Sequence, residues 1–95
     1  MSRRRFEHLR IEISVAVGIP VPRYPLWLRL KESGMDPEAL TRSAALAFCR
    51  GPLADFLAAQ GLQLAPRRRR RLLRSVARFD ADHLAPEERF SGKPA

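Results

Sequence analysis

The chain contains a single cysteine, Cys49, so it can form no internal disulfide and offers no set of thiolates for a metal. It also lacks any apolar run that approaches the roughly 18 residues of a membrane-spanning helix. The basic start, Met1 to Arg5, is followed by alternating residues instead of the continuous apolar segment of a secretory signal. We therefore expect a cytoplasmic protein that does not insert into membranes.

Acidic residues are scarce as well. The 95 residues include 10 Asp and Glu against 18 Lys and Arg, which gives a net charge of +8. Compositional drift would explain arginine in place of lysine, but neither the net charge nor its clustering. Such a charge favours nucleic acid or an acidic surface as the partner. The length suits a single compact domain, which we place at residues 1–90 with a basic N-terminal arm, followed by a disordered tail at 91–95.

Five consecutive arginines, residues 67–71, follow Pro66 and precede the apolar stripe Leu72, Val76 and Phe79 of a predicted helix. Cations are unfavourable at a helix N-terminus, because the free N–H groups there already carry partial positive charge. Folding alone gives no reason for this cluster, whereas a polyanion would neutralise the arginines and the helix dipole together. The pattern therefore predicts contacts to phosphate groups. We assign these contacts to Arg67, Arg68, Arg69, Arg70, Arg71, Arg74 and Arg78, helped by Arg3, Arg4 and Arg5.

The fold is predicted to be mainly α, with one N-terminal β-strand followed by about four short helices. Leu9, Ile11, Ile13 and Val15 alternate with polar residues up to Gly18, which is the period of a half-buried strand. Prolines keep the chain extended after this glycine. Prolines and glycines then place the helices at about 25–34, 37–50, 52–61 and 66–79.

The order Asp36-Pro37-Glu38 is typical of a helix start, with an acidic cap and a proline in the first position. It comes directly after Gly34, which is a favourable residue for ending the preceding helix. The sequence therefore predicts a tight junction between two helices at Gly34–Asp36.

A lone strand needs a partner, because its backbone groups would otherwise stay unpaired. Either Ile19–Val21 forms a second short strand, or the N-terminal strand pairs with its copy in another subunit. The second possibility predicts a homodimer.

The segments Leu30–Asp36 and Leu40–Ala44, together with Phe48, resemble the two-helix part of ribbon-helix-helix DNA-binding proteins. The resemblance covers only about residues 9–48. It implies an intertwined dimer whose two-stranded ribbon enters the major groove of DNA. The residues facing the bases would be Arg10, Glu12 and Ser14.

A different interpretation uses the helices at 52–61 and 66–79. Their proportions are those of a helix-turn-helix in which the arginine helix reads the DNA. Two packed helices joined by a loop are at least as common, so both interpretations stay open.

We expect a small basic nucleic-acid-binding regulator or accessory protein, with DNA favoured over RNA. The alternative is a non-enzymatic adaptor or accessory subunit that docks its arginine-rich face on an acidic protein. His8 and His83 have no companion at metal-ligand spacing, and Asp80 and Asp82 near a helix end need no role beyond capping. We expect no catalytic site, no cofactor and no bound metal.

Overall fold

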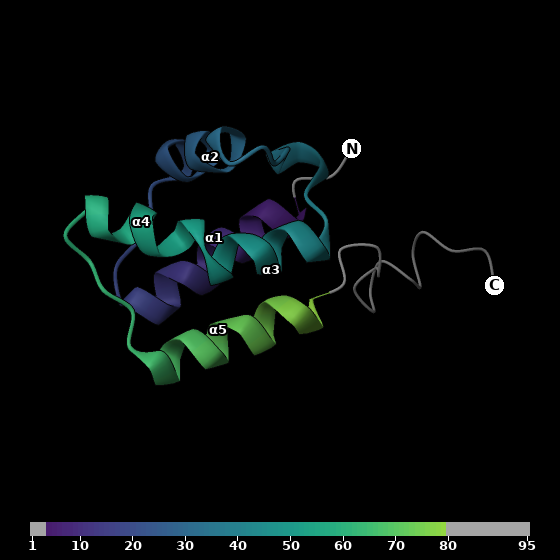
Figure 1. Ribbon diagram of the computed structural model, residues 1–95. Helices are drawn as coiled ribbons and strands as arrows, with labels where there is room; N and C mark the ends of the chain where they lie inside the picture. Colours follow the sequence, from purple (N-terminus) through teal and green to yellow (C-terminus); the bar gives the residue numbers. More distant parts are fainter. Residues whose placement is uncertain (1–3, 80–95) are drawn as a thin grey trace.

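The computed structural model describes residues 4–79, in which all regular secondary structure is helical and no strand is present (Figure 1). The elements are α1 (Arg4–Val17), α2 (Arg23–Glu32), the 3-10 turn η1 (Pro37–Ala39), α3 (Arg42–Arg50), α4 (Pro52–Ala59) and α5 (Pro66–Arg78). The predictions for Arg3, for residues 80–83 and for the tail at 91–95 lie outside the described residues.

The segment predicted to be the N-terminal β-strand is helix α1, so that prediction is wrong. Leu9 and Ile13 are fully buried, whereas Ile11 and Val15 are 49% and 67% exposed. A strand would have put all four side chains on one face, while a helix places residues four apart together and residues two apart on different sides. A helix also satisfies its backbone hydrogen bonds internally, which a lone strand cannot do.

The ribbon implied by the resemblance to ribbon-helix-helix proteins requires a strand in this segment, and residues 4–79 contain none. Two of the side chains placed towards the bases bond within the molecule instead. The Ser14 hydroxyl accepts a hydrogen bond from the Val21 N–H at 2.9 Å, and Arg10 pairs with Glu7 at 3.1 Å. A homodimer stays a prediction, and strand pairing no longer supports it.

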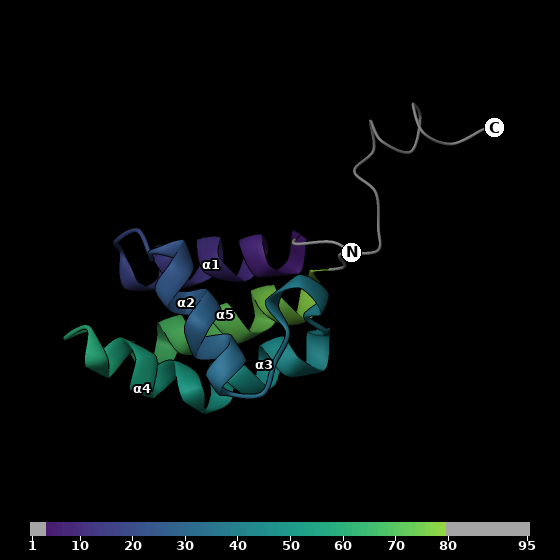
Figure 2. The same cartoon turned by 90° about the horizontal axis from the view of Figure 1, so that it is seen from above.

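Helix α5 packs against α1 on one side and against α3 on the other, and it runs antiparallel to both (Figures 1 and 2). Helix α2 covers the opposite side of the molecule from α5 (Figure 1). One core joins these layers, and the Phe6 and Trp27 rings meet in it edge to face, with their centroids 5.4 Å apart. Its largest fully buried side chains include Phe6, Leu9, Ile13, Leu26, Leu30, Phe48, Leu53, Leu57, Leu72 and Val76.

Glycines end two helices where the sequence predicts it. Gly34 has a φ of +82°, and the N–H of Met35 reaches back to the Leu30 carbonyl at 2.9 Å. Gly61, with a φ of +72°, closes α4 in the same way. A left-handed residue at this position turns the chain away while it satisfies the last carbonyls of the helix.

The junction after Gly34 is confirmed, but the element that follows is shorter than predicted. Asp36 caps η1, and its carboxylate accepts a hydrogen bond from the Glu38 N–H at 3.0 Å. The chain then extends through Leu40, and Thr41 caps α3 through its hydroxyl, which accepts from the Ala44 N–H at 3.0 Å. The predicted helix over 37–50 is therefore split in two by a second cap.

Replacing Asp36 with alanine should lower the free energy of unfolding by about 1 kcal/mol, because the Glu38 N–H loses its acceptor. Denaturant unfolding of the two proteins measures this difference. Asp36→Asn keeps an acceptor oxygen at the same place and serves as the control, with a stability close to that of the parent. An alanine variant as stable as the parent would show that this cap contributes nothing.

Candidate nucleic-acid interface

Helix α5 carries seven arginines and no acidic residue within its 13 residues. Leu72 and Val76 anchor it in the core, so the opposite side of the helix faces solvent. Pro66 in the first turn suits this helix start, because its missing N–H would have had no partner there. The sequence correctly predicts this helix and the burial of Leu72 and Val76, whereas Phe79, the third residue of the predicted stripe, caps the helix and is only half-buried. The packing decides where each arginine points.

Arg68 and Arg69 turn back onto neighbouring helices. Arg68 donates to the carbonyl of Ala16 at 3.1 Å, in the last turn of α1, and Arg69 donates to the carbonyl of Arg50 at 2.8 Å, at the end of α3. The last carbonyls of a helix lack intrahelical donors and carry partial negative charge, so a guanidinium is favourable there. These two arginines therefore stabilise the folded state, and the prediction that folding gives no reason for any arginine of the cluster is wrong.

The other five arginines of α5 point into solvent. They form no hydrogen bond or ion pair with any residue of the described range 4–79. Carboxylates that could have neutralised them are used elsewhere, for example Glu7 by Arg23 at 2.9 Å. We call this surface the arginine face. It consists of Arg67, Arg70, Arg71, Arg74 and Arg78.

A polar hollow of about 500 Å³ lies between α1 and α5, beside the arginine face. We call it the α1–α5 hollow. Glu12 is held in its wall by the Ser75 hydroxyl, which donates to the carboxylate at 2.7 Å, and the Nε2 atom of His8 lies 4.0 Å from the other carboxylate oxygen. Its lining consists of His8, Glu12, Arg71, Arg74, Ser75, Arg78 and Phe79. This hollow could not be predicted while residues 8 and 12 were assigned to a strand. In a helix, the spacing of four residues puts His8 and Glu12 on the same face, and this spacing is the signal that the sequence offers.

His8 stacks on Phe79 with the ring centroids 4.0 Å apart. Burial lowers the pKa of His8 below its ordinary value, and this effect outweighs the nearby carboxylate of Glu12, which raises the pKa. Arg5 lowers it further. The lowered pKa favours the neutral imidazole at pH 7, so His8 adds no full positive charge to the hollow.

The described N-terminal arginines are part of α1 and not of the arginine face. Arg4 and Arg5 belong to α1, and Arg5 is buried, where it donates to the Phe79 carbonyl at 3.2 Å. Arg42, which the sequence does not single out for this role, reaches the same carbonyl at 3.4 Å. Arg10 donates to the Val21 carbonyl in addition to pairing with Glu7. Arg5 and Arg10 are therefore committed to intramolecular contacts.

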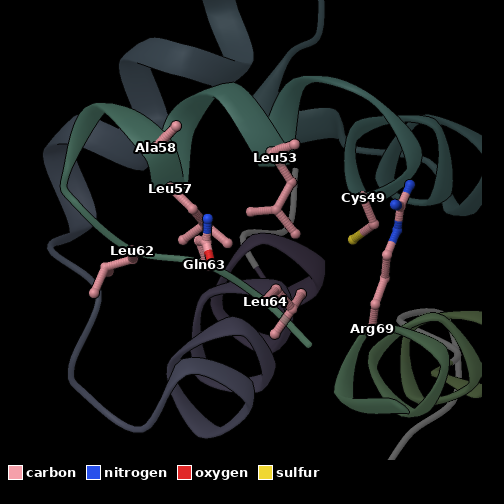
Figure 3. Close-up of a pocket in the computed structure, with 9 residues that line it drawn as sticks. Cys49, Leu53, Leu57, Ala58, Leu62, Gln63, Leu64 and Arg69 are labelled. Atoms are coloured by element: carbon pink, nitrogen blue, oxygen red, sulfur yellow. The ribbon is translucent and has the colours of Figure 1, made fainter. Parts of the chain in front are cut away.

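Near the opposite end of α5, Cys49 lines an apolar hollow of about 320 Å³. Figure 3 shows Leu53, Leu57 and Leu64 around this space, with Arg69 extended alongside the cysteine. Burial raises the pKa of the Cys49 thiol to about 12, and the neighbouring Arg69 offsets only part of that shift. The thiol is therefore a packing group at neutral pH, since only the thiolate is nucleophilic.

The helix-turn-helix interpretation depends on α4 supporting α5. Six residues, 60–65, separate these helices, and α5 packs mainly on α1 and α3. A reading helix in that motif follows a turn of about three or four residues and rests on the helix before it. The geometry of α4 and α5 thus differs from that motif, and the arginine face does not depend on it.

Within residues 4–79, no helix combines the length and the apolarity that a bilayer crossing requires. A scan against models of known protein families finds no match, and searches of curated proteins and of solved structures find no significant similarity.

Proposed function

We propose that this protein binds nucleic acid, with duplex DNA preferred, by laying the arginine face of α5 against the phosphate backbone. The observation that carries the proposal is the set of five exposed guanidinium groups on one helix face without an acidic partner among the described residues. Guanidinium groups stay charged at all physiological pH values and match the geometry of phosphate oxygens. A protein that binds DNA in this way would be located in the cytoplasm.

The composition of the arginine face favours contacts to phosphates over reading of bases. The other exposed residues of α5 are Pro66, Arg68, Arg69 and Ala77, so the helix has no Asn or Gln to pair with adenine, and only its arginines could contact a base, guanine. Phosphate contacts fix the position of a protein on DNA but carry no sequence information. An accessory protein that binds DNA with little sequence preference therefore fits this surface better than a regulator of one operator.

Replacing Arg67 and Arg70 with glutamine should weaken binding to duplex DNA on the order of tenfold and reduce the slope of log affinity against log salt by about two units. The reason is that each guanidinium on a phosphate displaces a counterion. Both side chains are exposed and unbonded among the described residues, so the fold should not suffer. Fluorescence anisotropy with a random duplex at several salt concentrations measures both quantities.

The control is the double variant Arg29→Gln/Lys31→Gln, in which Arg29 also loses an ion pair with Glu32 at 3.7 Å. It removes the same charge from α2, on the far side of the molecule (Figure 1). The control should keep the salt slope of the parent. An equal loss of DNA affinity in the two double variants would mean that binding depends on the net charge of the protein and not on the arginine face. If the parent protein binds no nucleic acid at physiological salt, the proposal is wrong and an acidic protein becomes the better partner.

A further inference from the structure

The α1–α5 hollow differs in chemistry from the rest of the arginine face. Arg71, Arg74 and Arg78 approach it from α5, while its other wall is the polar side of α1. Three guanidinium groups, all from α5, line a space large enough for a phosphate group, and His8 and Glu12 of α1 line its other side.

The charges that face the hollow define its ligand. Among the described residues that line the hollow, three guanidinium groups stand against one carboxylate, that of Glu12, which leaves two positive charges, because the lowered pKa of His8 favours its neutral form at pH 7. An internal phosphodiester carries one negative charge, whereas a terminal phosphate monoester carries about −1.5 to −2 at pH 7. The monoester therefore matches the hollow, and it also offers one more oxygen for charge-assisted hydrogen bonds.

The carboxylate of Glu12 is fixed in the wall and does not fold over the arginines. The Ser75 hydroxyl holds one of its oxygens at 2.7 Å, and His8 lies 4.0 Å from the other. No guanidinium of the hollow forms an ion pair with it, although Arg71, Arg74 and Arg78 share the same lining. These three arginines therefore keep their donors available within the described structure.

We propose that the α1–α5 hollow binds the phosphorylated end of a nucleic-acid strand, with Arg71, Arg74 and Arg78 as donors to the terminal phosphate. This inference rests on the proposed function and narrows it, because a protein with such a hollow recognises strand ends while the arginine face holds the adjoining backbone. Arg71, Arg74 and Arg78 belong to both surfaces, whereas Arg67 and Arg70 belong to the arginine face but are absent from the lining of the hollow. Variants of Arg67 and Arg70 can thus test the arginine face without altering the hollow.

The test compares two short duplexes that differ only in carrying or lacking 5′-phosphates. The parent should bind the phosphorylated duplex about tenfold more tightly, as expected when a charged group gains several charge-assisted hydrogen bonds. Arg71→Gln/Arg78→Gln should abolish this preference. Arg67→Gln/Arg70→Gln removes the same charge from the same helix, so it should weaken both duplexes equally and keep the preference.

A second probe, phenyl phosphate, isolates the hollow from the rest of the nucleic acid. Titration followed by NMR should give saturable shifts of the Arg71 and Arg78 side-chain N–H signals. Glu12→Gln should tighten this binding severalfold, because it removes the only carboxylate among the described residues that line the hollow. Ser75→Ala keeps that charge and frees the carboxylate from its hydrogen bond, so it should not tighten the binding. No effect of Glu12→Gln would mean that the anion binds elsewhere.

The outcomes separate this inference from the proposed function. Equal affinity of the parent for both duplexes overturns the end-binding role and leaves the arginine face standing. If the parent binds neither duplex, both proposals fail for nucleic acid, and saturable binding of phenyl phosphate would then reassign the hollow to another phosphate monoester. Retention of the preference in Arg71→Gln/Arg78→Gln also overturns the inference.

Discussion

Replacing Ile13 with alanine should lower the free energy of unfolding by about 2–5 kcal/mol, the usual cost of truncating a fully buried isoleucine. Ile13 lies in the core with Leu9 on the same face of α1. The loss combines the transfer free energy of the removed methyl and methylene groups with the cavity that they leave. Chemical denaturation of the parent and the variant gives the difference directly.

Ile11→Ala is the matched control, since it makes the same chemical change two residues away. Ile11 is 49% exposed on the outer side of α1, so its truncation should change stability by no more than about 0.5 kcal/mol. A strand would bury both isoleucines on one face and make the two variants equally costly. Similar losses from Ile11 and Ile13 would therefore contradict the helix.

The double variant Arg68→Gln/Arg69→Gln should lose about 1–2 kcal/mol of stability. Each guanidinium donates to a carbonyl at the end of a neighbouring helix, and each such bond contributes on the order of 0.5–1.5 kcal/mol, towards the lower end here because both side chains are exposed. Thermal unfolding of the variant should show a lower Tm than that of the parent.

Arg67→Gln/Arg70→Gln removes two charges from the same turn and should act in the opposite direction. Neither arginine has a partner among residues 4–79, and both lie where the helix dipole disfavours cations. The variant should be as stable as the parent or a few tenths of a kcal/mol more stable. If both doubles behave alike, the contacts to Ala16 and Arg50 contribute nothing to stability.

Much of the helical part of the fold can be predicted from glycines and prolines. Gly34 and Gly61 end helices in the left-handed conformation, and Pro52 and Pro66 begin them, because these two residue types have local conformational preferences that packing seldom overrides. The predicted class, mainly α with an N-terminal strand, is wrong, because all regular secondary structure in residues 4–79 is helical.

The N-terminal segment could not be assigned correctly from its pattern alone. Its residues 9, 11, 13 and 15 fit a period of two, while 6, 9 and 13 fit a helix, so both structures were compatible with the sequence. The helix exposes Ile11 and Val15 to solvent, which is unfavourable. The packing of α1 on α5 offsets this loss, and the pattern of the segment alone does not reveal that packing. Tertiary contacts thus decided between two locally acceptable structures.

The candidate site was predictable as a helix but not residue by residue. Successive residues of a helix point about 100° apart, so a run of five arginines must reach both neighbours and the solvent. Which arginines bond to carbonyls depends on where α1 and α3 end beside α5, and the sequence of α5 holds no information about that. Glu12 and Ser75 meet across the same packing, 63 residues apart.

The bonds that join α1 and α5 at both ends also set an order of events during synthesis. Arg5 reaches the end of α5, and Arg68 reaches the end of α1, so α1 lacks its main neighbour until the ribosome has made α5. Arg78 follows Val17 by 61 residues, a delay of roughly 3–12 s at ordinary translation rates. During that interval α1 lacks the helix on which it packs most, so the nascent chain should expose apolar surface of the kind that chaperones bind.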